Sequence, residues 1–190
     1  MIDHKHKFIF IHIPRTGGSS IESQFDYIEG EGREKNKHWN IFDWEDHLSK
    51  ETLGKYFKFS FVRNPWDLII SKYTSNWYNN RKRGMKIGKH MGKSLNFFLS
   101  NYKPAPWEHG DSFFDYIDPK QLDFIGRFEN RTNDLNYVSK KINVELNTAT
   151  HERKSKRSKC YTEYYNNETR NIVADRYARD IEYFGYKFGE

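Results

Sequence analysis

A run of small, hydroxyl-bearing and basic residues follows the first apolar stretch of the chain. Its members are Pro14, Arg15, Thr16, Gly17, Gly18, Ser19 and Ser20. Glycine lets a backbone approach a phosphate closely, and N–H groups at the start of a helix attract anions. An arginine adds a positively charged, planar donor. The run therefore predicts an anion site, and the alternative is an ordinary polar turn between a strand and a helix.

The same run does not match the phosphate-binding loop of many ATP- and GTP-using enzymes. That loop has the pattern G-x-x-x-x-G-K-[ST], and no lysine follows Gly17 or Gly18 here. A kinase of that kind also needs an acidic residue for Mg²⁺ near the end of the second strand, where Arg63 stands instead. Both differences weaken the prediction of a nucleotide-dependent kinase, which is the main alternative function.

A second pair of candidate residues surrounds a later helix start. Arg63 follows the apolar segment 56–62, and Ser71 lies about two helical turns further along the chain. We expect the two side chains to face one groove and to hold a second phosphate. The alternative is structural, with Arg63 capping the end of a strand and Ser71 acting as a small residue at a packing contact.

Two strand–turn–helix units are expected to position these residues. Segments 7–13 and 56–62 are short and mostly apolar, which is typical of strands buried in a parallel sheet. A helix is expected at 19–27 after the first strand. After the second, Asn64 suits the N-cap of a helix at 65–78, which begins with a proline. The repetition predicts an α/β fold with parallel strands.

Further elements are expected along the rest of the chain from hydrophobic spacing and capping signals. The expected helices are 42–53, 94–101, 132–142 and 168–183, and a third strand is expected at 122–128. Two segments, Arg81 to Lys93 and Thr150 to Lys159, are basic, and the second is expected to be a loop. For Arg81 to Lys93 two interpretations stay open, contact with an anionic acceptor and a mobile loop.

The composition limits the class of protein. At 190 residues, a single domain over residues 1–190 is expected. Only 36% of the residues are hydrophobic, but 17% are aromatic, and large rings supply the area that a core needs. The one cysteine, Cys160, excludes a disulfide framework within the chain and a cysteine-based zinc site. No apolar run is long enough to span a membrane and no signal peptide is evident, so we expect cytoplasmic placement.

Both candidate phosphate motifs, in this order, resemble those of sulfotransferases that use 3′-phosphoadenosine 5′-phosphosulfate (PAPS). Segment 10–21 resembles their 5′-phosphosulfate loop, and segment 59–73 resembles their 3′-phosphate motif. Segments 126–130, 161–165 and 180–188 are similar to later motifs of the carbohydrate sulfotransferase branch. The resemblance implies PAPS as donor, no metal, and a three-layer fold like that of P-loop NTPases, with a central parallel sheet flanked by helices.

The resemblance also implies roles for single residues. The 5′-phosphosulfate would be held by Arg15, Thr16, Gly17, Gly18, Ser19 and Ser20, and the 3′-phosphate by Arg63 and Ser71. A basic loop that closes over the nucleotide would contribute Arg153, Lys154 and Lys156, and the alternative for these residues is a solvated loop. Arg15 departs from the family pattern, in which lysine is commoner; it keeps the charge but is a planar fork rather than a point charge.

The proposed chemistry needs a base for the acceptor and positive charge for the leaving phosphate, and Arg15 supplies the charge. Histidine is the usual base near neutral pH. His38 lies between the two motifs, where the family often places a histidine, and is the first candidate. His47 is the second, and a carboxylate of the same segment, Asp43 or Glu45, is the third. His12 is expected to be a core residue of the first strand.

The function expected from these features is sulfuryl transfer to a hydroxyl, carried on a carbohydrate-like acceptor such as an oligosaccharide or polysaccharide. A glycolipid and a small metabolite stay open as acceptors. A kinase is the second function, and a basic nucleic-acid-binding module is the third. The nucleic-acid alternative is weakest because the basic residues lie in two loops rather than on a known reader motif; we expect no nucleic-acid partner.

Overall fold

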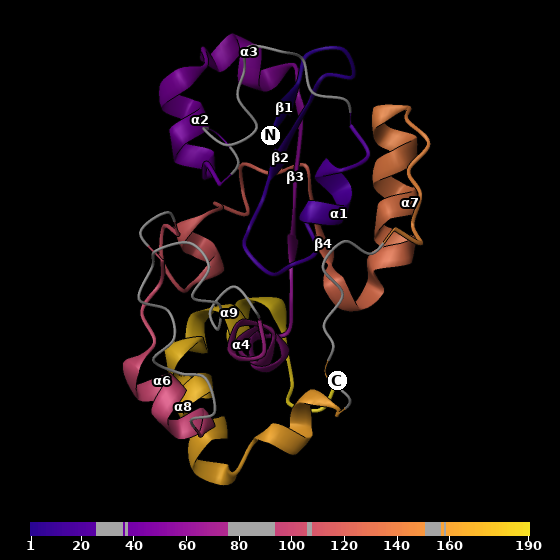
Figure 1. Cartoon of the computed structure of the whole chain (residues 1–190). Coiled ribbons are helices and arrows are strands. Elements are labelled where there is room, and N and C mark those ends of the chain that lie inside the picture. Colours follow the sequence, from indigo (N-terminus) through magenta and orange to yellow (C-terminus); the bar gives the residue numbers. More distant parts are fainter. Residues whose placement is uncertain (26–35, 37, 76–93, 106–107, 151–156, 158) are drawn as a thin grey trace, which may run out of the picture. The chain divides into compact units, whose positions relative to one another are not determined.

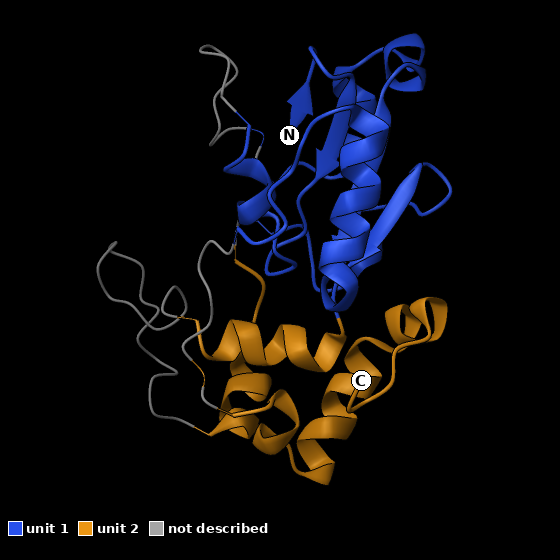
Figure 2. Cartoon of the chain, turned by 90° about the vertical axis from the view of Figure 1, so that its right-hand side faces the viewer, with its two compact units in different colours: residues 1–63, 106–153 blue, residues 64–105, 154–190 orange. Residues whose placement is uncertain are grey.

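The computed structural model describes residues 1–25, 36, 38–75, 94–105, 108–150, 157 and 159–190. They form two compact units, coloured blue and orange in Figure 2. Unit 1 comprises residues 1–63 and 106–153, and unit 2 comprises residues 64–105 and 154–190. The chain first passes from one unit to the other between Arg63 and Asn64, inside the second predicted strand–turn–helix segment. A single domain over residues 1–190 stays a prediction.

Unit 1 contains a four-stranded sheet in the order β1–β2–β3–β4 (Figure 1). The strands are β1 Ile2–Asp3, β2 Phe8–Ile11, β3 Phe57–Val62 and β4 Phe124–Arg127. β2, β3 and β4 are parallel, and β1 pairs antiparallel with β2 at one edge. The predicted α/β fold with a mostly parallel sheet is therefore confirmed, and the short antiparallel edge strand is an addition that the sequence pattern did not predict.

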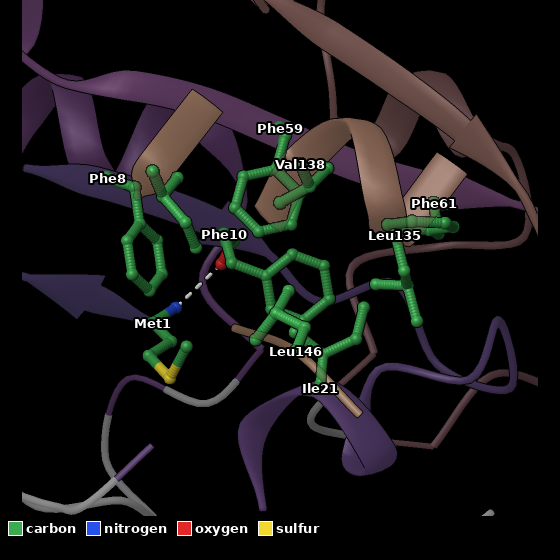
Figure 3. Packing of buried hydrophobic residues seen from close by; sticks show 10 residues of the cluster. Met1, Phe8, Phe10, Ile21, Phe59, Phe61, Leu135, Val138 and Leu146 are labelled. Carbon is green, nitrogen blue, oxygen red and sulfur yellow. Dashed lines mark hydrogen bonds between the residues drawn. The ribbon is translucent and has the colours of Figure 1, made fainter. Parts of the chain in front are cut away.

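Aromatic side chains build the core on one face of this sheet (Figure 3). Phe8 and Phe10 point from β2 to the same face because side chains alternate along a strand. The Phe10 ring stacks on Phe59 of β3, with 5.0 Å between ring centroids. Two helices, α1 Ser19–Glu22 and α7 Arg131–Ile142, cover these rings. The residues that α1 and α7 contribute are Ile21, Leu135, Val138 and Ile142.

Two short helices occupy the region where one helix over 42–53 was predicted, so that prediction is wrong. They are α2 Ile41–His47 and α3 Lys50–Gly54, and Figure 1 shows both on the opposite side of the strands from α7. Leu48 is extended, with φ −115° and ψ 145°. Ser49 then accepts a hydrogen bond from the Thr52 N–H and starts a new helix. Hydrophobic spacing carried no sign of this cap.

Unit 2 is helical in the part that the structure describes. Its helices are α4 Pro65–Tyr73, α6 Leu95–Asn101, α8 Asn167–Arg176 and α9 Ala178–Phe184, with a 3₁₀ turn η5 at Tyr161–Tyr164. The predicted continuous helix 168–183 is wrong, because Tyr177 leaves helical geometry at φ −111° and ψ 23°. Its side chain is fully buried. None of the helices in the described ranges is long and apolar enough to cross a membrane.

Two further 3₁₀ turns lie in unit 1, η3 Phe113–Asp115 and η4 Phe128–Asn130. The second follows β4 directly and leads into α7. The predicted helices at 94–101 and 132–142 are confirmed as α6 and α7. The helix predicted at 65–78 ends at Tyr73, and its residues 76–78 lie outside the described residues, as do residues 26 and 27 of the helix predicted after the first strand.

Candidate active site

The loop between β2 and α1 adopts an unusual backbone geometry. Arg15 and Gly17 have φ values of +71° and +90°, in the left-handed region that costs a side chain strain. α1 begins at Gly18 without a side-chain cap. The N–H groups of Ser20 and Ile21 donate to the carbonyls of Gly17 and Gly18. Turns that pass between right- and left-handed backbone, as this loop does, form concave anion-binding nests. The predicted anion loop therefore has a backbone suited to that role.

The hydroxyls of the loop are less exposed than its sequence suggests. Thr16 is buried and donates a hydrogen bond from Oγ1 to the Ile13 carbonyl over 2.8 Å. Ser20 is also buried. In this conformation the Thr16 hydroxyl stabilises the turn, because its proton is already donated to the backbone. Direct contacts of Thr16, Ser19 and Ser20 with a 5′-phosphosulfate stay predictions.

Arg63 connects the second motif to the first. It follows β3, the parallel neighbour of β2, so both motifs lie at the carboxyl edge of the sheet. Its Nη1 donates to the Arg15 carbonyl over 2.9 Å. Its guanidinium carbon lies 3.9 Å from the centroid of the Phe128 ring, and the residue is only 6% exposed. Arg63 therefore holds the strained Arg15 backbone in place, whereas its predicted contact with a 3′-phosphate stays a prediction.

Phe128 is a site residue whose role sequence reasoning missed. It opens η4, after the third parallel strand, and so reaches the same edge of the sheet. A Cβ at Gly17 would lie 3.2 Å from Phe128 Cδ2. The ring thus packs between Gly17 and Arg63. In the sequence, segment 126–130 was identified only through the family resemblance, which does not predict that Phe128 packs against Gly17 and Arg63.

Arg131, the first residue of α7, supports the segment that leads to the predicted basic loop. Its Nη1 and Nη2 donate to the carbonyls of Thr148 and Thr150 over 2.7 and 2.9 Å. Burial lowers the pKa of its guanidinium below the ordinary arginine value. The three predicted nucleotide contacts that follow, Arg153, Lys154 and Lys156, lie outside the described residues.

His38 lies beside His12, with 4.9 Å between the ring centroids. His38 Nδ1 is 3.3 Å from the His12 carbonyl oxygen. Because a carbonyl oxygen only accepts, Nδ1 of His38 carries the proton in this contact. The lone pair of the neutral ring is then at Nε2, which is the atom that takes up a proton. The geometry is therefore compatible with the predicted role of His38 as the base.

His109 holds the backbone of His38 and was not found from the sequence. Its Nε2 donates to the His38 carbonyl over 2.8 Å and lies 3.2 Å from Asp43 Oδ2. Asn40 Nδ2 is 3.2 Å from His109 Nδ1, which assigns the ring proton to Nε2. These partners are far from His109 in the sequence, so no local pattern predicts the contact.

The alternative bases have different surroundings. Asp43 caps the backbone N–H of Asn40 over 2.8 Å and also meets His109. His47 is exposed in the last turn of α2, and its ring lies against Trp39 and Trp44. Glu45 is an exposed residue of the same helix. Of the named candidates, His38 has the contacts that tie it to the loop after β2.

Unit 2 carries the remaining predicted residue, Ser71, which is buried within α4. Asp67, one turn earlier in α4, pairs with Arg157. Arg157 directly follows the predicted contact Lys156, so the ion pair attaches that end of the basic loop to α4. Because Arg63 belongs to unit 1 and Ser71 to unit 2, a joint 3′-phosphate site stays a prediction.

Within the described part of the chain, no group of three or more His, Cys, Asp or Glu side chains is placed to hold a metal ion.

Comparisons with known proteins agree with the sequence resemblance. Carbohydrate sulfotransferase 10 of Xenopus laevis is 22% identical, and the match covers 98% of this chain but 66% of that protein. An uncharacterised protein of Archaeoglobus fulgidus is 29% identical over 55% of this chain and 87% of its own length. The crystal structure of mouse sulfotransferase SULT7A1 complexed with PAP has the same fold, with a TM-score of 0.58 at 13% identity, covering 95% of this chain and 85% of that one.

A model of the sulfotransferase family matches residues 1–187. That match includes the loop after β2, Arg63, Phe128 and the helices α4, α6, α8 and α9 of unit 2. The chain therefore belongs to the sulfotransferase family.

Proposed function

We propose that this protein transfers the sulfuryl group of PAPS to a hydroxyl group. The observation that carries the proposal is the loop after β2, which is turned for an anion and braced by residues that follow the next two parallel strands. Ligands of open α/β sheets bind at the carboxyl ends of the strands, where this loop lies. Family membership and the likeness in fold to a sulfotransferase complexed with PAP support the same donor.

The backbone conformation and the positive charge of the loop suit PAPS as the donor. The positive φ values at Arg15 and Gly17 give the loop the kind of turned backbone that binds anions elsewhere. The 5′-phosphosulfate would lie against residues 15–20. Arg63 and Ser71 would contact the 3′-phosphate, and the loop with Arg153, Lys154 and Lys156 would close over the nucleotide.

When bound, PAPS supplies the sulfuryl group: the acceptor oxygen bonds to sulfur while the bond between sulfur and the phosphate oxygen breaks. The N–H groups of the loop and the Arg15 guanidinium would stabilise the charge that develops on the leaving phosphate. Donors that are already oriented stabilise such charge without reorganising during the reaction. Arg63 keeps these donors oriented, because it holds the Arg15 carbonyl.

His38 would take the acceptor proton at Nε2. Its Nδ1–H donates to the His12 carbonyl, and His109 donates to the carbonyl of His38. These two contacts fix both the ring and the backbone of the base. A base that is positioned in this way contributes about 10²–10⁴-fold to the rate.

The acceptor we propose is a carbohydrate hydroxyl. The likeness to carbohydrate sulfotransferase 10 supports this class, although the chain spans only 66% of that relative. Transfer from labelled PAPS to polysaccharide, glycolipid and small-alcohol acceptors tests it. Product on the polysaccharide or an oligosaccharide is expected, and product on the small alcohols alone would replace the carbohydrate by a small metabolite.

Calorimetry separates the sulfotransferase from the other two functions. PAP should bind at least about tenfold more tightly than ATP, a difference of about 1.4 kcal/mol. A random oligonucleotide should bind more weakly than PAP. Transfer should survive EDTA, because the loop and Arg15 supply the positive charge. Equal affinity for PAP and ATP would support the kinase, and preferred binding of the oligonucleotide would support the nucleic-acid module.

A further inference from the structure

A buried histidine–carboxylate pair lies directly beneath the loop after β2. His12 Nδ1 is 2.9 Å from Glu22 Oε1, and the two side chains are 4% and 1% exposed. His12 follows β2 and Glu22 ends α1, so the pair connects the strand to the helix across the loop. Burying two ionisable groups is costly unless they satisfy one another. Such a pair at this place needs an explanation beyond filling the core.

The His12 ring is in tight contact with the loop. A Cβ built on Gly18 would lie 2.2 Å from His12 Cδ2 and 2.5 Å from Nε2. Real Cβ atoms essentially never approach so closely. Only glycine at position 18 therefore permits the ring to lie where it does. Since Glu22 binds the Nδ1 side, the Nε2 side of the ring is the one that faces the start of α1.

The same residue also contacts the proposed base. The His12 carbonyl accepts from His38 Nδ1, and the two rings are tilted by 44° at 4.9 Å. His12 thus touches the donor loop with one edge of its ring and His38 with its face and carbonyl. The Met1 amino group also interacts with Glu22, and burial lowers its pKa to about 5.

We infer that His12 and Glu22 are positioning residues, which hold the donor loop and the base His38 in one fixed relation. The inference rests on the proposed function, because it concerns the base of that reaction. Glu22 fixes the orientation of the His12 ring, and the ring in turn fixes Gly18 and His38. Neither residue needs to touch the donor or the acceptor.

Replacing Glu22 tests this role through the rate of turnover. Glu22→Ala should lower kcat by about 10–100-fold, the range for partners that orient a functional group from outside. Glu22→Gln, which keeps an acceptor for the Nδ1–H group, should recover a large part of the loss. In a protein that already carries His38→Ala, adding Glu22→Ala should lower kcat by less than about threefold, because residues that act through one another are not additive.

Asp3→Ala is the matched control. Asp3 Oδ2 pairs with His6 Nδ1 over 3.1 Å in the same unit, but no contact links that pair to Gly18 or His38 in the described residues. Asp3→Ala should change kcat by less than about twofold, because the hydrogen bonds that it removes are those with His6 and not those of the His12–Glu22 pair. A fall in the unfolding temperature for Glu22→Ala with unchanged kcat, or the same loss of rate of about 10–100-fold when Glu22→Ala is added to His38→Ala, would overturn the inference.

Ring ¹⁵N signals of histidine-labelled protein separate this inference from the proposed function. The His38 signal, assigned by its loss in His38→Ala, should shift in Glu22→Ala and stay in place in Asp3→Ala. If the protein transfers no sulfuryl group but the signal shifts, the function is wrong and the coupling stands. If the His38 signal does not shift, the inference fails, whatever the activity.

Discussion

The two strand–turn–helix junctions of the chain look alike in sequence and differ in what their backbones do. After β2, the loop has positive φ at Arg15 and Gly17, and α1 starts without a side-chain cap. After β3, Asn64 caps α4 by accepting from the Trp66 N–H, and a proline occupies the first helical position. At the first junction the N–H groups of Ser20 and Ile21 donate to the backbone carbonyls of Gly17 and Gly18, whereas at the second junction a side chain caps the helix.

This difference shows how one chain divides two tasks between similar segments. The helix after the first junction has four residues, and it is held by Ile21 in the core and by the His12–Glu22 pair. The helix after the second has nine residues, most of them buried. We therefore expect substitutions at the first junction, and at Arg63, which holds the Arg15 carbonyl, to lower activity or donor affinity. Substitutions at the cap of the second helix should lower stability.

Replacing His38, the proposed base, should have the largest effect, and that effect is on kcat. His38→Ala should lower kcat by about 10²–10⁴-fold, the usual contribution of a positioned base. PAP affinity should stay nearly unchanged, because the base faces the acceptor. The acidic limb of the pH–rate profile should flatten, since that limb reports loss of the proton from the imidazole. Steady-state kinetics with calorimetry measures all three.

His47→Ala is the control for that prediction and should be mild, because His47 is exposed and packs on Trp39 and Trp44. If His47→Ala loses activity while His38→Ala keeps it, the base lies on α2. If neither variant matters, a carboxylate of the same segment, Asp43 or Glu45, becomes the candidate.

Arg63 should give the next largest effect, and on affinity rather than turnover. Arg63→Ala should weaken PAP binding by about 1.5–3 kcal/mol, the range for hydrogen bonds to charged groups. Part of the loss comes from the Arg15 carbonyl, which loses its partner. Arg63→Lys separates the two contributions, because lysine keeps the charge but not the planar fork. A lysine variant that binds as tightly as the original protein would show that charge alone matters; loss of folding with unchanged affinity would make Arg63 purely structural.

Gly18→Ala should weaken PAP binding by about 1–3 kcal/mol, the usual cost of an added methyl in a well-packed site. The methyl has to displace the His12 ring and distort the loop. Gly54→Ala is the control, because a Cβ there meets nothing within 4 Å. Binding and thermal unfolding are measured for both variants. Unchanged PAP affinity in Gly18→Ala would show that the loop tolerates movement of the ring.

The sequence predicted the strands and most helices of the fold because their signals are local. Segment 56–62 is mostly apolar, with Lys58 and Ser60 as its polar exceptions, and the helix expected at 94–101 is present as α6. The wrong predictions are at breaks that spacing alone cannot reveal. Ser49 starts a new helix inside an apolar pattern, and Tyr177 leaves helical geometry while its ring stays in the core.

The sequence predicted those residues of the candidate site that directly follow a strand. It did not predict those that reach the site through contacts between distant parts of the chain. The loop at 14–20 and Arg63 follow strands, so their spacing indicates their place. Phe128 and His109 reach the site only through the folded sheet and through contacts over long sequence separations. His12 was predicted as a core residue, which its burial confirms, but the sequence did not show its contacts with Gly18 and His38.

The smallest effect is expected at Asn64 of the second junction, and it tests whether this cap stabilises the fold without contributing to ligand binding. Asn64→Ala should lower the free energy of unfolding by about 0.5–2 kcal/mol, the range for a lost N-cap. It should leave the PAP affinity of the folded protein within about twofold, because this junction satisfies its own backbone. Asn64 also donates from Nδ2 to the Lys187 carbonyl over 2.9 Å, which adds to the loss.

Ser94→Ala measures the cost of a cap alone, because Ser94 accepts from the Phe97 N–H at the start of α6 in the same unit. Any excess loss in Asn64→Ala then belongs to the bond with Lys187. Chemical unfolding gives the stabilities and calorimetry gives the affinities. If Asn64→Ala weakened PAP binding about tenfold, or 1.4 kcal/mol, while stability hardly changed, the cap of α4 would belong to the ligand site together with Arg63. The division of tasks between the two junctions would then be wrong.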